Sequence, residues 1–207
     1  SKDSRYRTEL YKLRRKFMSH ADGLIHADLH TSNIMASRDK MKVIDMEFAF
    51  MGPFGYDLGY LVGNLISQYC AACFKRFPSE QNRKQFKAYL LATIKSLIET
   101  YMKTFTLCWE RSVKERYRGQ QGLLQSILQE VMVDMPGYAS MVNWFRSVSD
   151  IPYPDFDVIE NKDAKRNATV LSLMIDWGIM FGRYKYQSAD DLIETIIGIE
   201  EEFRKSL

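Results

Sequence analysis

The chain has 207 residues, of which 46% are hydrophobic and 27% are charged. This composition is typical of a globular domain and excludes a disordered protein, and the length is sufficient for a sizeable core. The 29 Lys and Arg residues nearly balance the 26 Asp and Glu residues, so the net charge does not favour nucleic acid as a partner. No run is apolar enough for a membrane span and no signal peptide is recognisable, so we expect a cytoplasmic protein.

The three cysteines do not form a recognisable framework. Their odd number argues against a disulfide-bonded secreted domain. Cys70 and Cys73 form a C-x-x-C pair inside an apolar helical run, and no second pair accompanies them. We therefore expect buried thiols at these positions, in preference to a zinc or redox site.

The N-terminal part of the chain predicts one amphipathic helix. Tyr6, Leu10, Leu13 and Phe17 recur at three- and four-residue intervals, and Gly23 is expected to end the helix. The pattern then changes to short apolar runs, GLIH, SNIMAS and MKVIDM, which polar turns separate. The sequence SRDK between two of these runs suits a hairpin turn, so this segment predicts a small β insert.

Helical patterns return after the insert and continue to the end of the chain. The expected helices span residues 57–75, 80–106, 107–134, 137–147, 163–186 and 189–204. The stretch DMPGYASM is expected to break the chain, and residues 149–157 are expected to form a loop because Pro152 and Pro154 oppose a helix. Ser188 suits the cap of the last helix. The predicted fold class is α+β, mostly α, with a small β-hairpin insert.

The β insert carries a concentration of polar groups at the ends of its apolar runs. Asp28 and Asn33 follow the first run, and Asp45 and Glu47 follow a later one. Carboxylate and carboxamide oxygens on adjacent loops are the ligands that Mg²⁺ prefers. Zinc is the alternative ion, because the three histidines of the chain lie nearby; they are His20, His26 and His30.

The spacing of these groups also fits phosphoryl transfer. That reaction needs an acid that orients the attacking hydroxyl, and metal ligands that neutralise the nucleotide phosphates. His26, Asp28 and Asn33 stand at the intervals of the kinase loop H-R-D-x-x-x-x-N, and the sequence DME stands where D-F-G would follow. The alternative is that these acids are only turn residues, but turn preferences alone do not produce this ordered pair of motifs.

Residues 26–66 resemble the protein-kinase-like superfamily of aminoglycoside and choline kinases, with its H-G-D-x-H loop, and in more detail the 5-methylthioribose kinase family. That family carries H-G-D-L-H-T and then V-I-D-P-E-F-[AS]-F-x-G-P-x-G-[FY]-D-x-G. The positions in register are Thr31, Val43, Ile44, Asp45, Glu47, Phe48, Phe50, Gly52, Pro53, Gly55, Asp57 and Gly59. The resemblance implies an ATP-dependent kinase that phosphorylates a sugar hydroxyl, most specifically methylthioribose, in methionine salvage.

A weaker resemblance covers residues 128–160, where the family carries a W-x-D motif and an Arg-Arg pair near the substrate. Asp134 holds the acid of the first motif, whereas Met132 replaces its Trp. Arg146 matches the second arginine, whereas Phe145 replaces the first. The resemblance implies substrate-binding roles for Arg146 and Asp134, and the loss of one arginine bears on substrate specificity.

Two further departures fall inside the strong match. Ala27 replaces the glycine of the catalytic loop, and this change is tolerated if φ is negative there. Met46 replaces the proline of D-P-E and leaves both acids in place. The metal chemistry therefore stays compatible with the sequence.

The resemblance assigns roles to the residues of both loops. It implies that Asp28 is the catalytic base and that Asp45 and Glu47 hold Mg²⁺ against the phosphates of ATP, with Asn33 as a further ligand. We expect His26 and His30 to brace the loop by hydrogen bonds. Asp57 is expected to cap its helix and to tie down the metal loop.

The upstream lobe of such a kinase is not recognisable. No G-x-G-x-x-G occurs, and fewer than thirty residues precede the catalytic loop. We therefore expect residues 1–207 to form the C-terminal lobe alone, with the N-terminal nucleotide lobe absent, an exposed apolar docking face and weak or no turnover in isolation. The family also implies a possible homodimer.

Two alternative functions remain open at this point. Within the superfamily, choline, an aminoglycoside or another sugar could be the acceptor, and Tyr138, Trp144, Tyr153 and Phe156 could supply an aromatic cage for choline. In a different class, the chain would be a pseudokinase-like binding module. The full set of Asp28, Asn33, Asp45 and Glu47 argues against a dead site.

Overall fold

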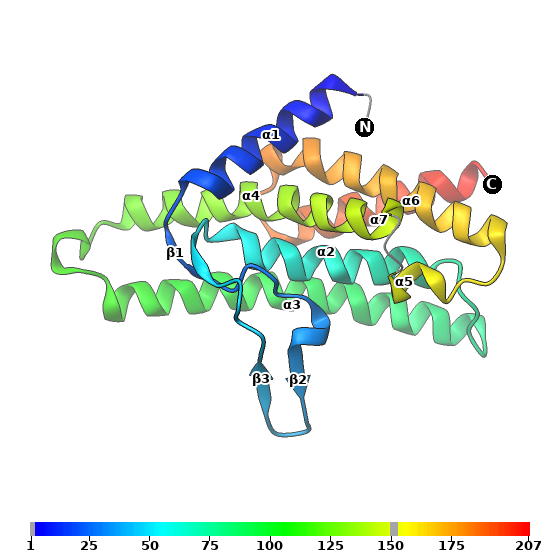
Figure 1. The fold of residues 1–207 in the computed structure, drawn as a ribbon, viewed down its shortest axis with the longest axis horizontal. Coiled ribbons are helices and arrows are strands. Elements are labelled where there is room, and N and C mark those ends of the chain that lie inside the picture. The colour runs from blue at the N-terminus through cyan, green and yellow to red at the C-terminus, as the bar shows by residue number, and fades with distance from the viewer. Residues whose placement is uncertain (1–2, 150–152) are drawn as a thin grey trace.

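The computed structural model describes residues 3–149 and 153–207, which form a helical bundle with a small β segment at one side (Figure 1). The longer helices are α1 (Ser4–Ser19), α2 (Gly55–Ala72), α3 (Glu80–Ser112), α4 (Gln121–Val148), α6 (Lys162–Gly182) and α7 (Ala189–Lys205). The shorter ones are α5 (Pro154–Asp157), η1 (Thr31–Asn33), η2 (Glu115–Tyr117) and η3 (Arg183–Lys185). The strands are β1 (Gly23–Ile25), β2 (Ile34–Ala36), β3 (Met41–Val43) and β4 (Phe50–Gly52). The predicted fold class, α+β and mostly α, is confirmed.

The four strands pair as two separate antiparallel ribbons. β1 pairs with β4, with Leu24 opposite Met51, and β2 pairs with β3, with Met35 opposite Lys42. The β2–β3 hairpin projects away from the bundle, as Figure 1 shows. The two ribbons therefore place the end of β1 and the end of β3 at the same side of α2, where the loops of the predicted site begin.

Helix α2 lies at the centre of the bundle and packs closely on α4. A Cβ atom on Gly59 would lie 2.6 Å from the carbonyl oxygen of Met135, and one on Gly63 would lie 2.6 Å from that of Ala139. Glycine is required at both positions because any side chain would push the two backbones apart. The remaining face of α2 is apolar, and Val62 and Ile66 are fully buried. The first turn of α2, which follows the β segment, is thus held rigidly by the core.

Several predicted boundaries are wrong for identifiable reasons. Helix α4 continues through Pro136 where a break was expected, because Met135 and its neighbours on both sides of the proline are buried in the core. Helix α3 extends to Ser112, six residues beyond the expected end, and Trp109 in this extension stacks on Phe105 at 6.4 Å between ring centroids. The helix expected over residues 107–134 therefore starts later, as α4 at Gln121. Gly23 does not end α1, which stops at Ser19; it begins β1.

Further expectations for the helical part concern the two cysteines, the cap of the last helix and the segment 149–157. Cys70 and Cys73 are buried, as expected, and burial raises the pKa of the Cys73 thiol to about 12. Ser188 caps α7 in a capping box with Asp191. Within the expected loop 149–157, the structure has the short helix α5, while residues 150–152, including Pro152, lie outside the described residues. In the described part of the chain, no helix has the length and apolarity to cross a membrane.

Candidate active site

The loop after β1 carries Asp28 and is fixed to the first turn of α2. The carboxylate of Asp57 accepts hydrogen bonds from the backbone N–H groups of His26 at 2.6 Å and Ala27 at 3.0 Å, one on each oxygen. The expectation that Asp57 caps its own helix is wrong: it is the third residue of α2, Phe54 occupies the cap position, and the bonds of Asp57 go to the catalytic loop. Burial raises the pKa of Asp57, and the two N–H donors oppose this only in part.

Ala27 adopts a left-handed backbone conformation, with φ of 67°. The condition of a negative φ, under which alanine was expected to replace the family glycine without difficulty, is therefore not met. A non-glycine residue in this region costs about 1 kcal/mol. The bond from the Ala27 N–H to Asp57 holds the residue in this conformation, so the strain is stored in the loop that presents Asp28.

His26 connects the catalytic loop to the loop after β3, which carries Asp45 and Glu47. Its side chain is buried, and Nε2 lies 2.8 Å from the carbonyl oxygen of Ile44. The backbone N–H of Asp28 donates to Nδ1 of the same ring at 3.3 Å. Because Nδ1 accepts, Nε2 must carry the proton and donate to Ile44. A second bridge, from the Ile44 N–H to the Asn33 carbonyl oxygen at 3.0 Å, holds the two loops together.

Asn33 and His30 surround Asp28 within the same loop. The side-chain amide of Asn33 is buried and donates to the backbone carbonyl of Asp28 at 3.0 Å. Nε2 of His30 lies 3.4 Å from Oδ2 of Asp28. The Asp28 side chain itself is only 28% exposed, so the carboxylate is presented to solvent in a restricted direction.

The loop after β3 is more open than the catalytic loop. Asp45 has a left-handed φ of 65°, and both Asp45 and Glu47 are exposed. Among residues 3–149 and 153–207, neither carboxylate forms an ion pair, and no three His, Cys, Asp or Glu side chains are grouped to hold a metal ion. The carboxylates of Asp28, Asp45 and Glu47 thus do not form a closed ligand set by themselves. Free, hard oxygen donors on adjacent loops nevertheless fit a Mg²⁺ ion whose other ligands are water and phosphate.

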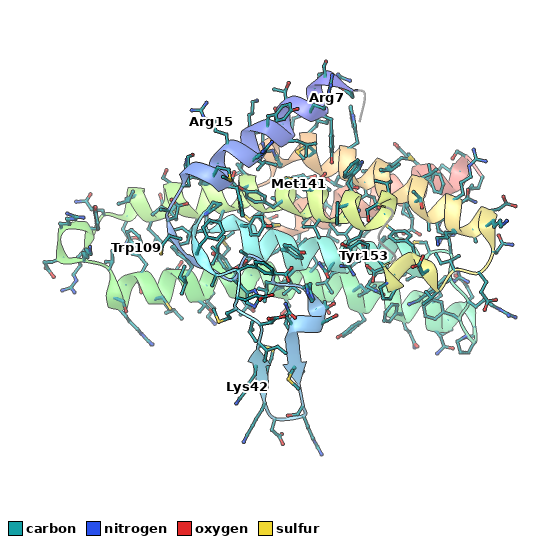
Figure 2. All side chains as sticks on the ribbon, in the orientation of Figure 1. Arg7, Arg15, Lys42, Trp109, Met141 and Tyr153 are labelled. Carbon is teal, nitrogen blue, oxygen red and sulfur yellow. The ribbon has the colours of Figure 1, made fainter. Side chains whose placement is uncertain are left out.

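A cavity of about 450 Å³ lies beside the catalytic loop, between α1, α2 and α4. Among the described residues, nine of those that line it are aromatic, two are arginines and none is acidic. Met141 and Tyr153, labelled in Figure 2, belong to its α4 side and to the segment before α5. The aromatic residues are Tyr6, Tyr11, Phe17, Tyr56, Tyr60, Trp144, Phe145, Tyr138 and Tyr153. The cavity therefore suits a ligand with an apolar part and without positive charge.

The two residues expected to bind substrate lie in different places. Arg146 lines the aromatic cavity, where its Nε donates to Asp155 at 2.6 Å and its guanidinium lies 4.5 Å from the Tyr153 ring. Asp134 is buried in an ion pair with Lys16 at 2.5 Å and lines a separate cavity beside the α3–α4 connection. The structure thus places Arg146 in the cavity that Tyr56 and Tyr60 of α2 also line, and places Asp134 in a different cavity.

Two cavity residues were missed by the motif comparison. Tyr60 lines the cavity, burial and the negative charge of Asp28 raise its pKa, and it follows Asp57 by three residues on the same face of α2. That spacing could have identified it. Arg14 lines the cavity from α1. Arg14 follows Leu10 by four residues and precedes Phe17 by three, so it flanks the apolar face of α1, whereas Arg15 lies on the opposite face.

Comparison with known proteins supports the resemblance. Residues 3–97 match the phosphotransferase enzyme family. The chain is 32% identical over 96% of its length to a methylthioribose kinase of Geobacillus thermodenitrificans (strain NG80-2), and 33% identical over 92% to that of Geobacillus kaustophilus (strain HTA426). It is 30% identical over 92% of its length to methylthioribose kinase 2 of Oryza sativa subsp. japonica. The suspected relationship to methylthioribose kinases is thereby confirmed.

The matched region is only part of each relative. It covers 48%, 46% and 47% of these three proteins, so the chain spans about half the length of the curated relatives it matches. The similarity extends from the loops of the site to the helices that surround the aromatic cavity.

Proposed function

We propose that this chain supplies the catalytic base and the acceptor site of an ATP-dependent small-molecule kinase, with the 1-hydroxyl of methylthioribose as acceptor, in methionine salvage. The observation that carries the proposal is the position of Asp28. It lies on a loop fixed to α2, beside an aromatic cavity and bridged to a second loop with two free carboxylates. The similarity to methylthioribose kinases supports the same acceptor.

In the proposed reaction, Asp28 accepts the proton of the acceptor hydroxyl. The hydroxyl oxygen forms a bond to the γ-phosphorus of ATP while the bond from that phosphorus to the β,γ-bridging oxygen breaks, and ADP leaves. The Asp57 carboxylate, which accepts a bond from the backbone of the catalytic loop, and the ring of His30 hold the Asp28 carboxylate in place for this transfer. His26, His30 and Asp57 are therefore proposed as supporting residues of the loop.

Asp45, Glu47 and Asn33 are the residues that would hold Mg²⁺. A bound ion would neutralise charge on the nucleotide phosphates. The amide nitrogen of Asn33 is used by the Asp28 carbonyl, so its oxygen is the atom left to face an ion. The exposure of Asp45 and Glu47 suits a ligand set that is completed only when the nucleotide arrives.

The lining of the cavity distinguishes between the candidate acceptors. Choline and aminoglycosides are cations, and their recognition calls for acidic groups beside aromatic rings. In the part of the chain that the structure describes, no lining residue of the aromatic cavity is acidic, whereas Arg14 and Arg146 are basic. We therefore favour a neutral sugar over both cationic acceptors, with Arg146 as a contact. Asp134 is left out of the proposed acceptor site because it lies in a different cavity.

We also propose that residues 1–207 act as a C-terminal lobe beside a nucleotide lobe. Two observations support this: the relatives are about twice as long, and the β segment exposes a set of large apolar side chains. These are Leu24, Met35, Met41, Val43, Ile44, Met46, Phe48 and Met51. We also propose that the protein forms a homodimer and is located in the cytoplasm.

The proposal is tested with the natural polypeptide that contains these residues, at its full length. Phosphorylation of methylthioribose, choline and an aminoglycoside is measured with ATP, with and without Mg²⁺. We expect kcat/KM for methylthioribose to exceed the other two by about 100-fold, and chelation of Mg²⁺ to abolish turnover. Faster turnover of a cationic acceptor, or phosphorylation of none, would contradict the proposal, and the second result would favour the binding-module alternative.

A further inference from the structure

Two tyrosines of α2, Tyr56 and Tyr60, line the aromatic cavity, and burial together with the negative charge of Asp28 raises the pKa of both. Tyr60 lies one turn after Asp57. Asp57 binds the backbone of the catalytic loop, and the Tyr60 ring lies beside the ring of His30 in the same loop. Helix α2 therefore contacts the loop at two levels from a single face.

Three side chains converge at this point. The ring centroids of His30 and Tyr60 are 6.5 Å apart, and Nε2 of His30 lies 3.4 Å from Oδ2 of Asp28. The Asp28 carboxylate thus lies beside an imidazole from its own loop, and that imidazole lies beside a phenol from α2. The phenol side of this arrangement opens on the cavity, which also contains Arg146 and Tyr153.

The Tyr60 hydroxyl is a hydrogen-bond donor at neutral pH. Burial and the negative charge of Asp28 raise the pKa of Tyr60 well above its usual value, so the phenol keeps its proton. An ionised carboxylate only accepts hydrogen bonds, so a bond between these two groups would run from the Tyr60 hydroxyl to Asp28. A charge-assisted bond of this kind restricts the carboxylate to one orientation.

We propose that Tyr60 is a positioning residue that aims the carboxylate of Asp28 at the acceptor in the aromatic cavity. The inference rests on the proposed function. The phenol bonds to the carboxylate on the cavity side and leaves Asp28 free to accept the proton of the acceptor hydroxyl. Tyr60 keeps its own proton throughout, so no additional proton transfer is required.

The kinetic test uses Tyr60→Phe, which removes only the hydroxyl, and Tyr60→Ala, which also removes the ring from the cavity wall. We expect Tyr60→Phe to lower kcat about tenfold with KM for methylthioribose within about twofold, because the base is misaimed while the cavity is intact. Tyr60→Ala should in addition raise KM. Tyr89→Phe, an exposed position on α3, is the matched control and should behave as the parent. A raised KM with unchanged kcat in Tyr60→Phe, or no change, would overturn the inference.

A second measurement does not depend on activity. Thermal unfolding is compared for the parent, Tyr60→Phe, Asp28→Asn and the double variant. If the two side chains are bonded, Tyr60→Phe should lower Tm in the parent and have less than about half that effect once Asp28 is replaced. Additive shifts would overturn the inference. If the parent phosphorylates no acceptor, the proposed function fails, whereas this comparison still decides whether Tyr60 holds Asp28.

Discussion

The two loops of the candidate site are neighbours, but they are held in different ways. The catalytic loop is bonded to α2 through Asp57, and its Asn33 and His26 side chains are buried. The loop after β3 is joined to it by backbone contacts at Ile44, while the side chains of Asp45 and Glu47 are exposed. One loop is therefore built before any ligand binds, and the other presents oxygen donors that have no protein partner among the described residues.

This difference separates two requirements of phosphoryl transfer. A base must be positioned to within a fraction of an ångström of the acceptor, which favours a loop anchored to a buried helix. A metal site that must also accept and release a nucleotide can leave part of its ligand set to water and phosphate. The anchor is α2, whose close contact with α4 depends on Gly59 and Gly63.

The largest expected effect separates the two loops by their response to Mg²⁺. Asp28→Asn should lower kcat about 1000-fold at every Mg²⁺ concentration, since it removes the base. Asp45→Asn should lower activity at low Mg²⁺ and recover in part when Mg²⁺ is raised about tenfold, because it weakens only a ligand. Steady-state kinetics across a Mg²⁺ series measure both. Recovery of Asp28→Asn by added Mg²⁺ would remove the distinction between the loops.

The anchoring itself is tested by stability. Asp57→Ala leaves two backbone N–H groups without their acceptor, and we expect it to lower the free energy of unfolding by about 3 kcal/mol. Glu47→Ala, in the open loop, should change it by less than about 0.5 kcal/mol because the side chain is exposed. Urea denaturation of both variants provides the comparison. Equal losses would show that the two loops are equally tied to the fold.

A smaller effect is expected in the pH dependence of stability. The pKa of Asp57 is raised in the folded protein, mainly by burial, so the folded state keeps this proton to a higher pH than the unfolded chain does. The stability of the parent relative to Asp57→Asn should therefore fall as the pH rises above about 4, and level off beyond the raised pKa. Denaturation of both proteins across this range measures the difference. A relative stability that increases with pH would contradict the assigned direction.

The sequence was sufficient to identify the loops but not their surroundings. Residue types and spacing located Asp28, Asn33, Asp45 and Glu47, because the order of two motifs along the chain is a local property. Asp134 and Arg146 came from a weaker match, and only the packing of α4 against α1 and α2 separates them into two cavities. This packing decides which of the two cavities each of them faces.

Predictions of helix boundaries failed for a similar reason, because tertiary packing overrode local preferences. The continuity of α4 through Pro136 depends on contacts with residues far away in the sequence, such as Met135 against Gly59 of α2. The local preference for a helix start was correct at Ser188, because its capping partner, Asp191, is only three residues away. The sequence is therefore a good guide to short-range features and a poor one where tertiary packing overrides them.

The smallest expected effect concerns the strain of the anchored loop. Ala27 is held at a φ of 67°, where glycine has no steric penalty, so Ala27→Gly should relieve about 1 kcal/mol, partly offset by the greater entropy of glycine in the unfolded chain. We expect a net gain of about 0.5 kcal/mol and a Tm higher by about 2 °C. Ala36→Gly, in the exposed strand β2, is the control and should lower Tm instead. A lower Tm for Ala27→Gly would mean that the bond to Asp57 holds this loop without strain.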